Sequence, residues 1–231
     1  MELLYKGKTK DVYRLADGLV KLKFKDDVTG EDGVFDPGAN TVGLTMDGAG
    51  KSGLLVTTHF FELLKQMEIP THFVEADIAD VSLTVKDAEM FGKGLEVICR
   101  YRAVGSFYRR YGAYCEEGQA LDAFVEVTIK DDQRGDPPIS EEALVSLQIL
   151  QTSEYEELIK RTKQIAHVVK GELAKHQLEL YDIKFEFGRD KTTGEVMLID
   201  EISGGNMRVA DESGSFITPF DLEKILIQPK N

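Results

Sequence analysis

The sequence predicts a globular protein that combines β-strands with α-helices. Its 231 residues are 42% apolar and 30% charged, which is ordinary for a soluble chain with a substantial core. Residues 182–187 alternate between charged and apolar side chains, which is the pattern of a half-buried strand. Residues 153–176 carry apolar side chains at helical spacing, which predicts one long helix. The length fits one large domain or two small lobes.

The net charge of −13 argues against nucleic acid or a membrane as a partner. A surface this acidic repels polyanions and anionic lipids, so we expect neither. Cys99 and Cys115 are too few for a disulfide framework and do not show zinc-ligand spacing. The N-terminus lacks an apolar signal segment and no apolar run reaches membrane-spanning length, so we expect a cytoplasmic protein.

The N-terminal segment, residues 3–15, reads as two strands joined by a turn at Gly7. Lysines alternate around this glycine, among them Lys8 and Lys10. Because glycine lets the backbone approach a ligand and lysine supplies a point charge, the hairpin is typical of a phosphate cover in a nucleotide site. A basic hairpin that only faces solvent is the alternative.

Residues 18–27 form the next predicted strand, with apolar side chains on one face and lysines on the other. Lys25 and Asp27 are candidates for the nucleotide site, because a strand lysine beside a phosphate cover recurs in phosphoryl transfer. An exposed charged face explains the pattern equally well.

Residues 28–53 are rich in Gly and Asp and predict a loop. The run G-A-G-K-S at 48–52 is not a P-loop, because Thr45 stands where that motif needs glycine. Ser52 is instead the expected cap of a helix over 54–67. Residues 71–85 predict strands that return to the N-terminal sheet.

Residues 95–110 place four arginines within eleven residues of an acidic protein, after a buried strand at 95–99. Arg100 and Arg110 are candidate ligands because guanidinium groups bind phosphate bidentately. Ser106 lies in a Gly-Ser turn that exposes a hydroxyl and backbone N–H groups to an anion. The segment predicts a sugar-phosphate pocket, with a basic helix face paired to surface acids as the alternative.

Three further elements complete the prediction: a strand at 124–130, the helix at 153–176 and a short amphipathic segment at 220–227. Ser153 and Glu156 have the spacing of a capping box at the start of the long helix.

Residues 181–211 predict a hairpin that carries acidic side chains. Asp182, Lys184 and Glu186 share one face of its first strand, and Asp200-Glu201 end its second strand at 196–202. If Glu186 faces position 196, Asp182 faces Asp200, and a one-residue slip brings Glu201 there instead. Crowded carboxylates on strands suit Mg²⁺, which takes one or two carboxylates together with substrate phosphates. A solvated strand face is the alternative.

Taken together, these stretches resemble the SAICAR synthetase (phosphoribosylaminoimidazole-succinocarboxamide synthase) family. The matching runs are Y-K-G-K-T-K-D-V-Y (5–13), F-K-D-D-V-T (24–29), L-E-V-I-C-R-Y-R-A-V-G-S (95–106), K-D-D-Q-R-G-D-P-P-I (130–139), D-I-K-F-E-F-G (182–188) and D-E-I-S-G-G-N-M-R-V-A-D (200–211). They follow one another in family order over most of the chain.

The resemblance implies an α+β fold in which ATP lies between a β-rich nucleotide-binding lobe, residues 1–95, and a mixed lobe, residues 96–231, with the substrate and metal site. It implies a ligase that joins carboxyaminoimidazole ribonucleotide and L-aspartate with Mg-ATP, giving the succinocarboxamide, ADP and phosphate. A dimer or larger homo-oligomer is expected from the family.

The resemblance also implies roles for single residues. The ATP-binding positions are Lys8, Lys10, Lys25 and Glu96. The substrate-binding positions are Arg100, Ser106, Arg110, Lys184, Ser203 and Arg208. Catalytic roles fall to Lys184, Asp182 and Arg208, with Asp132 as a supporting acid. The metal ligands are Glu186 and Asp200, with Glu201 as the alternative to Asp200.

Some positions depart from the family pattern. Gly204-Gly205 replaces a Pro-Asp step, Tyr101 replaces an asparagine, and the final helix is reduced to 220–227. These departures leave open a divergent paralogue, which would be an ATP- and Mg²⁺-dependent carboxylate–amine ligase or small-molecule kinase with another substrate. A nucleotide-binding module without catalysis is a third hypothesis, which the acids at 186 and 200 disfavour.

Overall fold

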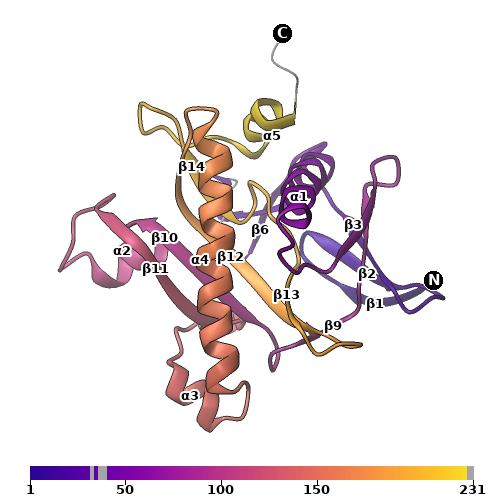
Figure 1. Ribbon diagram of the computed structural model, residues 1–231. Helices are drawn as coiled ribbons and strands as arrows, with labels where there is room; N and C mark the ends of the chain where they lie inside the picture. Colours follow the sequence, from indigo (N-terminus) through magenta and orange to yellow (C-terminus); the bar gives the residue numbers. More distant parts are fainter. Residues whose placement is uncertain (32–33, 36–40, 228–231) are drawn as a thin grey trace. The chain divides into compact units, whose positions relative to one another are not determined.

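The computed structural model describes residues 1–31, 34–35 and 41–227 (Figure 1). The chain forms two compact units. Unit 1 comprises Met1–Glu89, Gly188–Gly205 and Thr218–Asn231, and unit 2 comprises Met90–Phe187 and Asn206–Ile217. The expected lobe boundary at residue 95 differs from this division, because two later segments that we assigned to the second lobe pack with the N-terminal unit.

Unit 1 is built on an antiparallel sheet with the strand order β1-β2-β3-β8-β7. Its strands are β1 (Glu2–Lys6), β2 (Lys10–Arg14), β3 (Val20–Phe24), β7 (Phe73–Asp77) and β8 (Ser82–Val85). The helix α1 (Ala49–Gln66) buries Leu54, Phe60 and Leu64, and it lies beside α5 (Pro219–Ile227) (Figure 1). The predicted strands at 3–15, 18–27 and 71–85 are therefore confirmed.

The prediction of a loop over residues 28–53 was wrong within the described residues. A small sheet of order β5-β4-β6 is formed by β4 (Asp27–Glu31), β5 (Val34–Phe35) and β6 (Val42–Thr45). These strands are short and their glycines break any alternation, so the pattern hides them. The helix α1 begins at Ala49, so Ser52 lies inside it and is buried, and Gly48 occupies the cap position. Residues 32–33 and 36–40 of the predicted loop lie outside the described residues.

Unit 2 is organised around β10 (Leu95–Arg102), which pairs with β11 (Ala120–Ile129) on one edge and with β12 (Glu179–Asp190) on the other. The other edge of β12 pairs with β14 (Met207–Ala210), a strand that the sequence pattern did not predict. The strands β9 (Ala88–Met90) and β12 continue across the division between the units.

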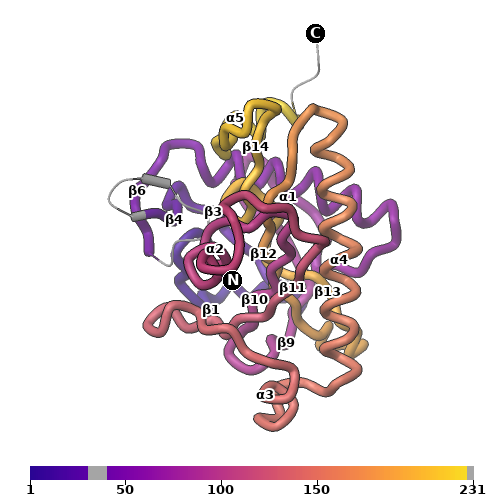
Figure 2. Tube along the Cα trace, turned by 90° about the vertical axis from the view of Figure 1, so that its left-hand side faces the viewer, coloured from indigo at the N-terminus to yellow at the C-terminus, as the bar shows by residue number. Residues whose placement is uncertain are grey.

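The helices of unit 2 are α2 (Gly105–Tyr111), α3 (Glu141–Ser146) and α4 (Thr152–Ala174), and a 3₁₀ turn η1 spans Asp132–Arg134. The long helix α4 packs across β10 and β11 and buries Leu158, Ile165 and Leu173, as its spacing predicted (Figure 2). Its capping box consists of Gln151 and Glu154 rather than Ser153 and Glu156, because the cap lies two residues earlier than the pattern suggested.

The hairpin after β12 has a different register from the predicted one. The Asp190 N–H donates to the Glu195 carbonyl at 2.9 Å, and β13 (Val196–Ile199) has only four residues. β13 ends at Ile199 because Asp200 adopts a left-handed backbone with φ of 67°. The prediction that Asp182 faces Asp200 was therefore wrong. Asp182 instead lies opposite Arg100 on one side and Arg208 on the other.

Candidate functional site

In unit 1, one buried lysine binds two adjacent acids, and we call Lys10, Asp200 and Glu201 the lysine site. The Lys10 Nζ lies 3.0 Å from Asp200 Oδ1 and also donates a hydrogen bond to Glu201 Oε1. Burial lowers the pKa of Lys10, but the charges of Asp200 and Glu201 outweigh burial and raise it above its ordinary value. Lys10 is therefore a permanent cation, and both alternatives for the acidic position contact it.

His72 contacts the backbone of the lysine site at Asp200 and was not predicted as a site residue. Its Nε2 lies 3.2 Å from the Asp200 carbonyl oxygen, and its backbone N–H donates to the Leu198 carbonyl. Burial lowers the pKa of His72 to about 4, against the attraction of Asp200. The neutral imidazole donates to the Asp200 carbonyl and holds its left-handed backbone. Nothing in the sequence separates this histidine from the other three.

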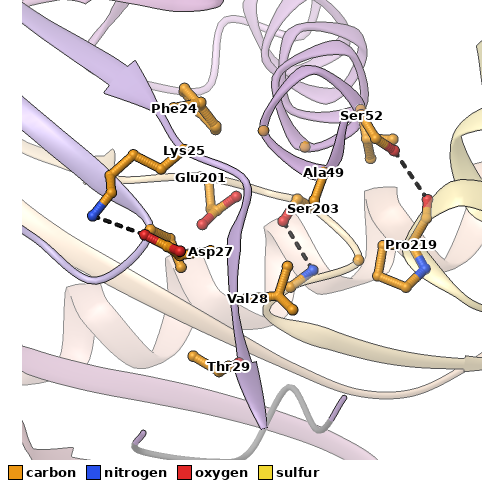
Figure 3. Close-up of a pocket in the computed structure, with 16 residues that line it drawn as sticks. Phe24, Lys25, Asp27, Val28, Thr29, Ala49, Ser52, Glu201, Ser203 and Pro219 are labelled. Carbon is orange, nitrogen blue, oxygen red and sulfur yellow. Dashed lines mark hydrogen bonds and ion pairs between the residues drawn. The ribbon is translucent and has the colours of Figure 1, made fainter. Parts of the chain in front are cut away.

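A pocket in unit 1 brings together several predicted positions (Figure 3). Its lining includes Phe24, Lys25, Asp27, Ser52, Glu201, Ser203 and Pro219. The Lys25 Nζ lies 3.0 Å from Asp27 Oδ2 and donates to the Gly7 carbonyl at 3.2 Å. Hydrogen bonds from Lys25 and then Thr45 lower the pKa of Asp27. Lys8 is half-buried in the turn between β1 and β2.

Three residues of the G-A-G-K-S run, Ala49, Gly50 and Ser52, line this same pocket together with Gly204-Gly205. A Cβ on Gly204 would lie 2.7 Å from the Cα of Pro219, closer than real contacts allow. Glycine at 204 is therefore required by the packing of the first residue of α5.

In unit 2, three arginines and two acids form a continuous set that we call the arginine network: Arg100, Arg110, Arg208, Glu126 and Asp182. Arg100 NH1 and Arg208 NH1 both donate to Asp182 Oδ2, at 2.7 and 2.8 Å. Arg100 also donates from Nε and NH2 to Glu126 Oε1, at 2.8 and 2.6 Å. Arg110 NH2 donates to Glu126 Oε2 at 2.5 Å. The network joins β10, β11, β12, β14 and α2 of one unit.

The turn before α2 fits the network closely. Arg100 NH2 donates to Ser106 Oγ at 2.9 Å. Gly105 has φ of 56°, and a Cβ there would lie 2.8 Å from Arg208 NH1. Only glycine combines this backbone conformation with space for the guanidinium group. Burial raises the pKa of Asp182, while the charges of Arg208 and Arg100 act against that rise.

Two further ion pairs lie on the same face of β12. The Lys184 Nζ donates to Glu96 Oε1 at 2.7 Å, and Lys130 Nζ donates to Glu186 Oε1 at 2.5 Å. Burial lowers the pKa of Lys184, but the charge and hydrogen bond of Glu96 outweigh it and raise the pKa overall. Lys184 is therefore a cation rather than a base. Asp132 is exposed on η1.

The predicted residues thus divide between the units. Unit 1 holds Lys8, Lys10, Lys25, Asp200 and Ser203, and unit 2 holds Glu96, Arg100, Ser106, Arg110, Asp182, Lys184, Glu186 and Arg208. Glu126 and His72 were missed because their contacts are non-local.

Magnesium was predicted on Glu186 and Asp200. Over residues 1–31, 34–35 and 41–227, no group of three or more His, Cys, Asp or Glu side chains could hold a metal ion. A larger acidic cluster is not required, since Mg²⁺ is commonly held by one or two carboxylates and substrate phosphates. Glu186 belongs to unit 2 and Asp200 to unit 1, and each carboxylate offers oxygen donors of the kind that Mg²⁺ prefers. No helix in the described part of the chain is long and apolar enough to span a membrane.

Comparison with known proteins decides the family. The family model described as SAICAR synthetase matches residues 3–219 of this chain. The chain belongs to the SAICAR synthetase family. A phosphoribosylaminoimidazole-succinocarboxamide synthase of Clostridium tetani is 60% identical over 228 residues, which cover 99% of this chain and 100% of that protein.

Solved SAICAR synthetases share the fold. A type-2 SAICAR synthetase in complex with ADP has a TM-score of 0.86 at 27% identity and covers 98% of each chain. A type-1 enzyme of Pyrococcus horikoshii has a TM-score of 0.78 at 27% identity, covering 96% of this chain and 91% of that one. The predicted α+β fold and family are confirmed.

The divergent alternative is not supported. The alignment with the Clostridium protein leaves none of that protein without a counterpart here, so the reduced C-terminal segment is no sign of a different reaction.

Proposed function

We propose that this chain joins carboxyaminoimidazole ribonucleotide and L-aspartate to give SAICAR, ADP and phosphate. The chain is a carbon–nitrogen ligase of the SAICAR synthetase family. The observation that carries the assignment is the full-length match to a curated synthase at 60% identity. ATP use is supported by a structural neighbour in complex with ADP.

The arginine network is the proposed receptor for the phosphate of the ribonucleotide. Arg110 and Arg208 offer guanidinium forks, Ser106 offers a hydroxyl, and Arg100 binds the acids that orient them. Holding the phosphate fixes the carboxylate of the ribonucleotide for reaction and so gains rate by proximity.

The lysines of unit 1 are the proposed contacts of the ATP phosphates. Lys10 is a buried cation and Lys25 lies in the pocket of the same unit, with Lys8 in the turn above β2. Such charges stabilise negative charge that builds up on a transferring phosphoryl group. Glu96 is the proposed nucleotide contact of unit 2. Lys184, which remains protonated, supplies positive charge to the substrate, and Ser203 is a further substrate contact.

Glu186 and Asp200 are the proposed ligands of Mg²⁺, which supplies charge neutralisation on the phosphates when it is bound. Within the protein, Glu186 binds Lys130, and Asp200 binds Lys10. Each carboxylate is thus already oriented by a lysine.

The chemistry needs a leaving group better than oxide on the ribonucleotide carboxylate. We propose that a carboxylate oxygen attacks the γ-phosphorus of ATP, so that ADP leaves and an acyl phosphate forms. The aspartate amine, after losing a proton, then attacks the acyl carbon and phosphate departs. Asp182 is proposed to act in this reaction through Arg100 and Arg208, which it binds.

The first experiment measures ADP release with ATP, Mg²⁺, carboxyaminoimidazole ribonucleotide and L-aspartate, and omits each in turn. Release that needs every component, with SAICAR detected as product, is the expected result. ADP release without aspartate, accompanied by a phosphorylated product, would instead indicate a kinase.

The metal ligands are tested by Glu186→Gln and Asp200→Asn, with Glu201→Gln as the matched variant beside Asp200. Binding of Mn²⁺ in the presence of ADP, followed by electron paramagnetic resonance, reports on the metal without turnover. We expect the first two variants to lose both Mn²⁺ binding and activity while remaining folded. Retention of both properties would remove the assignment, and loss only in Glu201→Gln would transfer it to Glu201.

The proposal includes a homo-oligomer, dimeric or larger, and a cytoplasmic enzyme that acts on small molecules without a nucleic-acid or membrane partner. Sedimentation equilibrium of the purified chain tests the assembly, and a monomer at micromolar concentration would contradict it.

A further inference from the structure

Glu126 is a buried acid on β11 that no sequence motif singled out. Its side chain is 7% exposed, and its two oxygens bind different arginines. Oε1 accepts two hydrogen bonds from Arg100, and Oε2 accepts one from Arg110. Glu126 therefore links Arg110 to the arginine network.

The arginines of the network differ in their freedom to meet a ligand. Arg100 has a side chain that is 2% exposed and is enclosed by Glu126, Asp182 and Ser106. The side chains of Arg110 and Arg208 are 28% and 14% exposed. Arg100 is thus the internal brace of the network, meaning the buried arginine that binds both acids, and Arg110 and Arg208 are the arginines that can reach an anion.

The two acids repeat one arrangement on either side of this brace. Asp182 ties Arg208 to Arg100, and Glu126 ties Arg110 to Arg100. Three guanidinium groups against two carboxylates leave 3 − 2 = +1 charge within the network. That surplus attracts a phosphate, while the acids fix the direction of each fork.

We propose that Glu126 is a positioning residue for the substrate phosphate, because it locks Arg110 onto the same brace that holds Arg208. The inference rests on the proposed function, which makes that phosphate part of a ribonucleotide. Without Glu126, the Arg110 guanidinium keeps its contact with Tyr111, whose ring centre lies 5.4 Å from Arg110 Cζ. A long side chain released in this way must be ordered again by the ligand, which weakens binding.

The competing explanation is that Glu126 only neutralises the buried Arg100 so that the protein folds. Both explanations predict a loss of stability when the charge is removed, because an uncompensated buried cation is costly. They differ in substrate affinity. If Glu126 is purely structural, its replacement leaves the ribonucleotide KM of the folded protein unchanged. If Glu126 is a positioning residue, its replacement raises the ribonucleotide KM and does not change the KM for ATP.

The experiment compares Glu126→Gln with Glu179→Gln in the full-length protein. Glu179 is the matched control, because it binds Arg102 at 2.7 Å in the same unit but lies outside the network. We measure kcat, the KM of ribonucleotide and ATP, the melting temperature and the Kd of ribose 5-phosphate by calorimetry. Glu126→Gln is expected to raise the ribonucleotide KM and the ribose 5-phosphate Kd by roughly tenfold, equivalent to about 1.4 kcal/mol. Glu179→Gln is expected to leave both constants at wild-type values.

Two more variants keep the test decisive. Glu126→Asp retains the charge but is one methylene shorter, so it should fold and still raise the ribonucleotide KM several-fold. Arg110→Gln combined with Glu126→Gln should raise the ribonucleotide KM little beyond Arg110→Gln alone, because the proposed positioning effect of Glu126 acts through Arg110. Wild-type KM and Kd in folded Glu126→Gln overturn the proposal. If that variant does not fold, wild-type constants in Glu126→Asp overturn it.

The binding arm separates this inference from the proposed function. Absence of turnover in the wild type, with ribose 5-phosphate binding that depends on Glu126, removes the ligase assignment and leaves the phosphate receptor. Normal turnover with KM values that do not depend on Glu126 supports the ligase assignment and removes the positioning role of Glu126.

Discussion

The lysine site of unit 1 and the arginine network of unit 2 both bury cations among carboxylates, but with different side chains. In the lysine site, one Nζ meets two acids that are adjacent in the chain. In the arginine network, planar forks connect acids on separate strands, β11 and β12.

The difference lies in what each arrangement fixes. An ammonium group is a compact point charge whose donors rotate freely, whereas a guanidinium group presents its donors in one plane. The lysine site therefore places charge, and the arginine network places charge with direction. The lysine site suits a phosphoryl group that moves during reaction. The arginine network suits a phosphate that must stay where it is bound.

The largest expected effect comes from Asp182→Asn, compared with Asp80→Asn. Both acids bind two cations, but the Asp182 side chain is 5% exposed and binds arginines, while the Asp80 side chain is 39% exposed and binds lysines. Loss of the buried acid should lower the free energy of unfolding by about 3–5 kcal/mol. Loss of the exposed acid should cost less than about 1 kcal/mol. Urea denaturation measures both, and equal losses would contradict the contrast.

The next effect tests whether charge alone serves the lysine site. Lys10→Met should reduce kcat by about 100-fold or more, as expected when an electrostatic contact of the transition state is removed. Lys10→Arg keeps the charge beside Asp200 and Glu201 and should retain most of the activity. Steady-state kinetics at saturating ATP compare the two variants. An equally inactive Lys10→Arg would show that shape matters at this position too.

A smaller effect is expected when charge is kept but direction is lost in the arginine network. Arg208→Lys should raise the ribonucleotide KM by roughly tenfold, because a bidentate fork is replaced by a point charge. The KM for ATP should not change. Lys25→Arg in unit 1 is the reciprocal exchange and should alter the ATP KM only slightly. A rise in the ATP KM of Arg208→Lys would place this residue elsewhere.

The smallest effect concerns the thiols. Cys99 precedes Arg100 on β10 and is buried, and burial raises its pKa to about 11, so its reactive thiolate is suppressed at pH 8. Cys115 is partly exposed. A disulfide exchange reagent should therefore titrate one thiol in the native protein and two in guanidinium. Rapid titration of both thiols in the native state would indicate that the strand beside the network opens readily.

Local pattern predicted much of the fold. Alternation predicted β3 and β12, and helical spacing predicted α4, because the apolar side chains of each element recur at the period of a strand or a helix. The register of the β12–β13 hairpin was not predictable in this way. It depends on where the turn at 191–194 begins and on the positive φ of Asp200, which an acidic residue pair does not reveal.

The candidate site was predicted where charge clusters along the chain and missed where it is shared between distant segments. Arg100 and Ser106 lie within one motif, and their contact in the network is short-range. Glu126 belongs to an ordinary strand, and only its pairing beside β10 brings it to Arg100. His72 likewise acquires its contact from a segment more than a hundred positions away.

The segmented composition of unit 1 has a consequence for biosynthesis. Its chain passes out to unit 2 and returns twice before the unit is complete. Lys10 is translated well before its partner Glu201, which follows 191 positions later. A nascent chain therefore carries this lysine without its counter-charges until the intervening residues have been synthesised. Unit 1 can begin to fold early on the ribosome, but its charged centre can form only after Glu201 has been translated.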